Sequence, residues 1–132
     1  MTGAGKGAIS GKIPAAAGCA GQPGATKGVA QSSYRIGTGA GFSADRLQPA
    51  VDLAQRGNLQ ALVLECLGER TVAFGHRDRM VNPARGYNAL LEPRMRALLP
   101  ACRAAGTTII TNMGGANPRA AAEQTVEVAR AL

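Results

Sequence analysis

The sequence predicts an α/β fold built on a parallel sheet, and two observations support that prediction. First, short apolar or β-branched runs at 34–36, 59–66 and 107–111 alternate with longer segments of helical periodicity. Such runs are typical of buried strands, and long helical connections between them imply parallel pairing. Second, the stretch 107–118 combines a strand, a glycine turn and a capped helix start. Open α/β sheets present ligand-facing loops in this layout.

The expected element order is β-α-β-α-α-β-α. Helices usually cover both faces of such a sheet, so we predict a three-layer, Rossmann-like parallel sheet. Three strands are few for this architecture, and a truncated domain is therefore expected. The predicted elements are a strand at 34–36, a helix capped by Asp45 and closed by Gly57, a strand at 59–66, helices at 69–81 and 88–105, a strand at 107–111, and a helix over 118–130 capped by Asn117.

The chain divides by composition into a leader and a body. Residues 1–32 are rich in Gly and Ala, lack acidic residues and show no periodicity, which predicts a disordered leader. Residues 33–132 are predicted to form one partial α/β domain. The net charge is +7, but the arginines of the body are scattered and aromatic residues make up only 3% of the chain. Nucleic-acid binding is not expected, because base stacking needs aromatic side chains.

The composition also restricts where the protein can be located in the cell and which chemistry it can perform. No apolar run approaches the roughly 18 residues of a membrane span, and no secretory signal is recognisable. Three widely spaced cysteines, Cys19, Cys66 and Cys102, suggest reduced thiols. A cytoplasmic protein without membrane contact is therefore expected. One histidine and no acidic cluster predict no metal site, and no cofactor can be assigned.

The glycine segment after the first strand is a candidate ligand loop. Gly37, Gly39 and Gly41 approach a dinucleotide fingerprint, but the third glycine comes one residue early and Phe42 takes its place. Two interpretations remain open, tight turn geometry alone or anion binding by backbone N–H groups. For the second interpretation we name Gly37, Gly39, Gly41, Phe42 and Ser43 as ligand-binding candidates.

Glu65 is the candidate catalytic residue. A carboxylate directly after an apolar strand must be hydrogen-bonded, paired or solvated in a cleft. It could orient a ligand or act in acid–base chemistry. A salt bridge to Arg70 or a bond to a loop amide would explain it equally well. Its neighbour Cys66 is interpreted as a small buried hydrophobe, while Glu69 and Arg70 are ligand-binding candidates in the same loop.

The loop after the third strand supplies the remaining candidates, Asn112, Met113, Gly114 and Asn117. Asn112 at a strand end suits amide recognition, although both asparagines could be turn and cap residues. Parallel neighbouring strands lie about 4.8 Å apart and end at one edge of the sheet. The loops 37–43, 65–70 and 112–117 are therefore expected to share one crevice.

Several separated segments resemble one known family. They are 35–42 (RIGTGAGF), 64–71 (LECLGERT) and 109–118 (IITNMGGANP), together with 86–92 (GYNALLE) and 94–96 (RMR). In this order they are similar to the amino-terminal part of the acyclic terpene utilisation (AtuA-type) family, over about residues 34–132. Members of that family are several times longer, so the resemblance implies a fragment. It also implies a role in bacterial breakdown of acyclic terpenes such as citronellol and geraniol, or of branched acids, through CoA thioesters.

Three hypotheses follow for function. The first is a piece of a terpene-catabolic protein whose chemical step is not assigned. The second is a non-catalytic nucleotide- or anion-binding module, and the third is an inactive gene remnant. The expected partner is a small molecule, with a CoA thioester or a nucleotide as candidates. Self-association or a missing C-terminal part is expected to cover the sheet edge and apolar helix faces.

Overall fold

Within residues 33–132, four helices and three strands follow one another in the predicted order. The structure is a computed structural model that describes residues 33–132, so the disorder predicted for 1–32 lies outside the described residues. The elements are β1 (Ile36–Ala40), α1 (Gln48–Arg56), β2 (Ala61–Leu64), α2 (Glu69–Val81), α3 (Leu91–Ala105), β3 (Thr108–Thr111) and α4 (Pro118–Arg130).

The strands form a single sheet in the order β1-β2-β3, and both pairs are parallel. Gly37 is in register with Leu62, which in turn is in register with Ile109. The predicted α/β arrangement with a parallel sheet is therefore confirmed. Because all three strands run in one direction, their carboxyl ends lie at one edge of the sheet.

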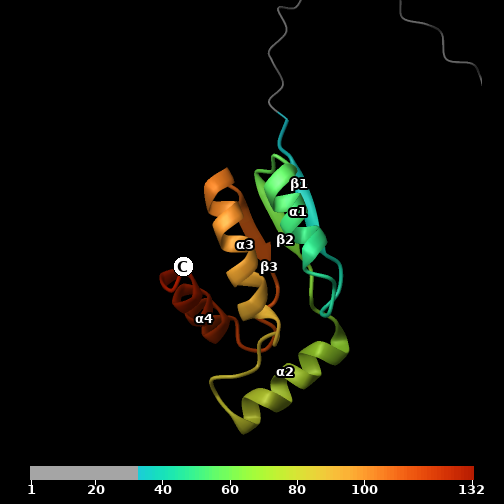
Figure 1. Cartoon of the computed structure of the whole chain (residues 1–132). Coiled ribbons are helices and arrows are strands. Elements are labelled where there is room, and N and C mark those ends of the chain that lie inside the picture. The colour runs from blue at the N-terminus through green and yellow to red at the C-terminus, as the bar shows by residue number, and fades with distance from the viewer. Residues whose placement is uncertain (1–32) are drawn as a thin grey trace, which may run out of the picture. The chain divides into compact units, whose positions relative to one another are not determined.

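The core lies on one face of this sheet, between the strands and the helices α1 and α3 (Figure 1). Leu62 and Leu64 of β2 are 0% and 1% exposed, and Leu98 of α3 is 0% exposed. Helix α4 packs against α3, whereas α2 lies apart from the other helices. The loops that follow the strands are thus attached to a packed two-layer body.

The opposite face of the sheet is uncovered in the part of the chain that the structure describes. Ile36 and Ile110 are 63% and 52% exposed, and Thr38 and Thr108 beside them are also exposed. The third layer expected from the sequence is therefore not formed by residues 33–132. On the central strand, Leu62 faces the helical layer, whereas Ala61 is on the uncovered face and is flanked by its register partners Ile36 and Thr108.

Most helix ends agree with their sequence signals, and two starts differ. Gly106 ends α3 with φ of 68°, and the Asn117 side chain caps α4 by accepting the Ala120 N–H at 3.4 Å. Helix α3 begins at Leu91 rather than Asn88, because the Asn88 side chain forms a turn by accepting the Leu90 N–H at 2.8 Å. Helix α1 is preceded by Leu47 without a side-chain cap, so the prediction that Asp45 caps it is wrong.

Candidate functional site

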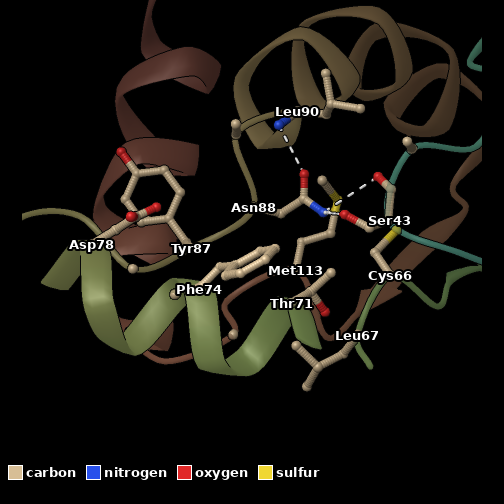
Figure 2. A pocket seen from close by; sticks show the side chains of 15 residues that line it. Ser43, Cys66, Leu67, Thr71, Phe74, Asp78, Tyr87, Asn88, Leu90 and Met113 are labelled. Carbon is tan, nitrogen blue, oxygen red and sulfur yellow. Dashed lines mark hydrogen bonds between the residues drawn. The ribbon is translucent and has the colours of Figure 1, made fainter. Parts of the chain in front are cut away.

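Three loops meet at the carboxyl edge of the sheet. They follow β1, β2 and β3, and residues from all three line one pocket, namely Ser43, Cys66 and Met113 (Figure 2). A second, more open hollow is formed by the first two loops and the start of α2. The parallel topology thus brings together segments that are more than 20 residues apart in the chain.

Glu65 is held at this edge by two amides. Its Oε1 accepts the Asn112 Nδ2–H at 2.9 Å and the Leu67 backbone N–H at 3.0 Å. The Asn112 amide, and secondarily the Leu67 N–H, lower the pKa of this exposed carboxyl. Asn112 also accepts the Cys66 N–H at 2.7 Å, so one side chain joins the ends of β2 and β3. The loop-amide interpretation of Glu65 is therefore the one observed, and its carboxylate is ionised at neutral pH.

Gly37 and Gly39 lie inside β1 rather than in the following loop. A Cβ on Gly37 would lie 2.5 Å from Leu59 Cδ1, and one on Gly39 would lie 2.9 Å from Leu64 Cδ2 and 3.2 Å from the Ala50 Cβ. These two positions allow α1 to approach the sheet closely. Close packing is thus sufficient to account for both glycines, and neither lines the pocket or the hollow.

The backbone N–H of Gly41 is bound by a carboxylate of the same loop. Asp45 Oδ2 accepts it at 2.9 Å, while Asp45 Oδ1 accepts the Arg46 N–H at 2.8 Å. These two backbone bonds, Gly41 first, lower the pKa of the Asp45 carboxyl. Asp45 therefore occupies donors that an external anion would need, and it does so instead of capping α1.

The open hollow collects most of the candidates from the first two loops. We call it the polar hollow, and its volume is about 280 Å³. Glu65, Glu69 and Arg70 supply its charged groups, and the start of α2 forms one side. Its remaining lining residues are Gly41, Phe42, Ser43, Leu67, Gly68 and Thr71.

The pocket that all three loops line is next to it, against α2, and we call it the α2 pocket. Its volume is about 300 Å³, and its walls are mostly apolar, including Leu67, Phe74, Tyr87 and Met113 (Figure 2). Ser43, Leu67 and Thr71 line both spaces, so the two adjoin each other. An apolar pocket with a polar mouth is the usual form of a small-molecule site.

Asn88 organises the α2 pocket, although the sequence indicated only a turn at this position. Its Nδ2 donates to Ser43 Oγ at 2.9 Å, and its backbone N–H donates to the Met113 carbonyl at 2.8 Å (Figure 2). With its bond to the Leu90 N–H, it connects the loops after β1 and β3 to the start of α3. No local pattern predicts this role, because its bonds to Ser43 and Met113 are remote in the sequence.

Cys66 forms another wall of the α2 pocket, in contact with a buried arginine. Arg94 of α3 is 2% exposed, and its guanidinium donates to Cys66 Sγ and, at 2.6 Å, to the Asp45 carbonyl. Burial raises the pKa of the Cys66 thiol, and the positive charge of Arg94 opposes that effect only in part. Cys66 is thus a neutral, buried thiol, in agreement with the structural interpretation.

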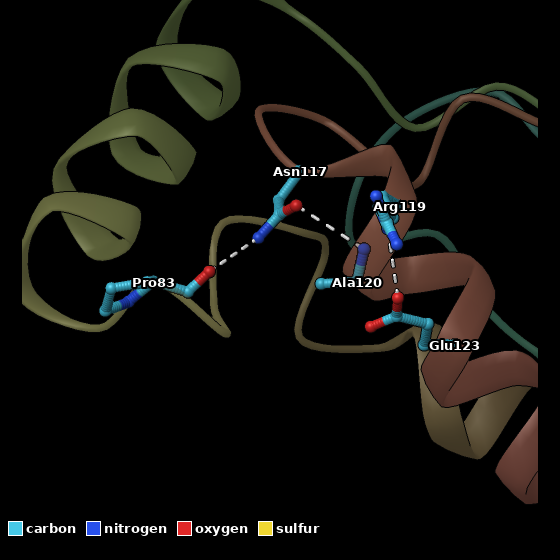
Figure 3. Close-up of polar contacts among 5 residues, drawn as sticks. All are labelled: Pro83, Asn117, Arg119, Ala120 and Glu123. Carbon is cyan, nitrogen blue, oxygen red and sulfur yellow. Dashed lines mark hydrogen bonds and ion pairs between the residues drawn. The ribbon is translucent and has the colours of Figure 1, made fainter.

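Asn117 and Gly114 line neither the α2 pocket nor the polar hollow. Asn117 Nδ2 donates to the Pro83 and Arg85 carbonyls, both at 2.8 Å, which ties the turn before α3 to the start of α4 (Figure 3). Its amide oxygen caps α4, so each polar atom of the side chain is already bonded within the protein. A Cβ on Gly114 would lie 2.7 Å from the Pro118 Cα, which explains that glycine by packing.

The groove around Asn117 is polar and shares Tyr87 with the α2 pocket. It is lined by Arg119 and Glu123, which form an ion pair at 3.2 Å (Figure 3), and by Glu92 and Glu127. Within residues 33–132, no three His, Cys, Asp or Glu side chains gather closely enough to hold a metal ion. None of the described helices is long and apolar enough to cross a membrane.

Comparison with known proteins adds one match. Residues 34–132 match the model of a family described as "Acyclic terpene utilisation family protein AtuA". The match covers all of the strands and helices described above. No curated protein and no solved structure matches the chain.

Proposed function

The chain belongs to the acyclic terpene utilisation (AtuA) family, and we propose that it binds an acyclic terpenoid or related branched acid as its CoA thioester. The place of binding is the carboxyl edge of the sheet, where the α2 pocket adjoins the polar hollow. This proposal gives the protein a part in terpene catabolism. The chemical step performed on the ligand is left unassigned.

One observation carries the proposal, namely the pairing of an apolar pocket with a charged mouth. Phe74 and Met113 belong to the pocket, whereas Glu65, Glu69 and Arg70 belong to the hollow. An amphiphilic molecule, with a hydrocarbon part and a polar end, matches this two-part site. A small polar metabolite would leave the apolar walls without a partner.

Glu65 is proposed to orient the polar end of the ligand. Because its pKa is lowered, it does not donate a proton at neutral pH, and it is a weak base. A fixed, exposed carboxylate beside two amides is suited to accepting hydrogen bonds from a ligand. Glu65 thus keeps its place as the candidate functional carboxylate, with an electrostatic role in preference to proton transfer.

The alternative is a nucleotide- or anion-binding module that uses the glycine segment. The start of α2 would favour this function, because its backbone N–H groups attract anions. The Asp45 carboxylate on the Gly41 N–H opposes it, since that carboxylate repels a phosphate. A CoA thioester also carries phosphates, but they lie at the far end of the molecule from its acyl carbonyl. Only the uncharged thioester group has to lie at this loop, and the terpenoid thioester is therefore the better fit.

Calorimetric titration of the chain with citronelloyl-CoA, CoA and AMP tests the proposal. We expect citronelloyl-CoA to bind more tightly than CoA, and AMP to bind least. Glu65→Gln retains an oxygen that can accept both amides and removes the charge, and should weaken binding by about tenfold, or roughly 1.4 kcal/mol. Glu92→Gln is the matched control, because Glu92 is paired with Arg96 on α3 away from both spaces. Equal binding of AMP would favour the anion-binding module, and no binding at all would favour an inactive remnant.

A further inference from the structure

Helix α2 differs from the other three helices because it buries none of its residues. Helices α1, α3 and α4 each bury apolar side chains, for example Ala54, Leu98 and Val128. An amphipathic helix is normally held by packing its apolar stripe on a core. In α2 the inward stripe consists of Thr71, Phe74, Gly75 and Asp78, and this stripe faces the α2 pocket.

The spacing of that stripe shows that one side of α2 forms the pocket wall. Positions 74, 75 and 78 follow position 71 by three, four and seven residues, which places all four on one helical face. Phe74 at its centre is 48% exposed, although phenylalanine is usually buried. The helix thus presents its inward face to a cavity where the other helices present theirs to a core.

Contacts along the second half of α2 hold it beside the body. Arg79 Nη1 donates to the Ala116 carbonyl at 2.8 Å. Gly75 approaches the Gly86 carbonyl so closely that a Cβ on Gly75 would lie 2.8 Å from that oxygen. Helix α2 has no extended packing against another described helix or strand. These contacts fix its distance from the body without filling the space beneath Phe74.

We infer that the α2 pocket holds the aliphatic chain of a ligand, and that this chain is the core on which α2 packs. This inference rests on the proposed function for the chemical class of the ligand and for nothing else. A cavity of about 300 Å³ has room for on the order of ten heavy atoms, since a water molecule takes about 30 Å³ of liquid. Leu67, Leu90 and Met113 face Phe74 across this space, and an aliphatic chain would contact all four.

The polar end of such a ligand leaves the pocket through the residues shared with the polar hollow. The hydroxyls there are already bonded, Ser43 Oγ to Asn88 Nδ2 and Thr71 Oγ1 to the backbone of Gly68. The passage therefore leaves few polar groups to be desolvated by a chain. Beyond it lie Glu65 and Arg70, where a carboxylate or thioester end meets charged groups.

Hydrogen exchange of the chain with decanoate and with citronellate tests this inference directly. Either probe should slow exchange of the 69–81 amides several-fold, while exchange in 118–130 stays unchanged. Phe74→Ala should weaken decanoate binding by about tenfold, because it removes a large apolar contact. Met80→Ala is the matched control on the same helix, since Met80 is 87% exposed and does not line the pocket.

The outcomes separate this inference from the proposed function. Protection of α2 by decanoate without binding of citronelloyl-CoA would support the cavity assignment and reject the terpenoid thioester. Binding of citronelloyl-CoA with unchanged exchange in α2 and unchanged affinity of Phe74→Ala would overturn the inference alone. Failure of every probe to bind would overturn both.

Discussion

Three glycines in one short segment have different physical roles. Gly37 and Gly39 point to the same face of β1, where Leu59, Leu64 and Ala50 occupy the space of a side chain. Gly41 has no atom closer than 4.0 Å to its would-be Cβ and belongs to the polar hollow. The sequence pattern could not separate these roles, because it placed the end of the strand at Ile36 and all three glycines in a loop.

We expect Gly39→Ala to destabilise the fold by about 1–3 kcal/mol, because its Cβ would crowd the side chains of Leu64 and Leu62 on β2 and the Ala50 Cβ of α1. Gly41→Ala should change the free energy of unfolding by less than about 0.5 kcal/mol. Urea denaturation of both variants measures the difference. If Gly41→Ala proved the more destabilising of the two, the packing explanation would be wrong.

The hydrogen bond between Glu65 and Asn112 gives a second prediction at the residue scale, which concerns how the stability of the protein depends on pH. Because the pKa of Glu65 is lowered in the folded protein, its ionised carboxylate stabilises the fold at pH values above the ordinary glutamate pKa of about 4.3. This contribution is lost as the pH falls through the lowered pKa. Asn112→Ala removes the largest cause of that shift. The stability difference between wild type and this variant should therefore shrink as the pH falls below about 4. Denaturation at pH 7 and pH 3 checks this, and a difference that grew at pH 3 would contradict it.

At the scale of the elements, local sequence signals predicted the bounds of the helices better than the residues that the helices contact. The bounds of α2 and α4 follow the expected 69–81 and 118–130, since Glu69 and Asn117-Pro118 are strong start signals. Arg94 was not recognisable as a buried residue. Its position, three residues after Leu91 and four before Leu98, lies on the inward face of α3, but arginine is normally an exposed residue. The remote contacts to Cys66 Sγ and the Asp45 carbonyl explain why it is buried here.

Arg94 and Arg96 allow a matched test on one helix. Arg94→Ala should destabilise the protein by about 2 kcal/mol or more, because it leaves the half-buried Asp45 carbonyl without its donor and opens a cavity where the buried guanidinium was. Arg96 is half exposed and forms an i,i+4 pair with Glu92, so Arg96→Ala should cost at most about 0.5 kcal/mol. Thermal unfolding of the two variants distinguishes them, and equal losses would refute the distinct role of Arg94.

At the scale of the whole molecule, the parallel topology correctly predicted the sheet edge at which the loops meet. The sequence did not predict that one face of the sheet would lack a helical layer within residues 33–132. Short apolar strands imply cover on both faces, yet in residues 33–132 helices α1 and α3 cover only one. The pattern failed because Ile36, Val63 and Ile110 have the composition of a buried strand face whether or not a second layer is present. The convergence of the three loops was predictable, since it depends only on strand direction.

Because one face of the sheet is exposed, we predict that molecules of this chain associate with one another. Ile36 and Ile110 are more than half exposed, and such apolar surface favours contact between molecules. We expect sedimentation to show association that increases with protein concentration, and Ile110→Thr to reduce it while keeping a β-branched side chain. Val126→Thr on α4, at 46% exposure, is the control. A monomer at every concentration would contradict the prediction.

The Asp45 carboxylate has a consequence for which molecules the glycine loop accepts. It is attached four residues from the Gly41 N–H, so it competes with any free anion as an intramolecular ligand at an effective concentration of roughly millimolar or higher. A phosphate or carboxylate that took the Gly41 N–H would have to displace it and then tolerate its charge nearby, so the acid end of a ligand such as decanoate is expected at Arg70 instead. An uncharged carbonyl group, such as that of a thioester, meets no such charge repulsion, so the loop discriminates against anions through a competitor that the chain itself provides.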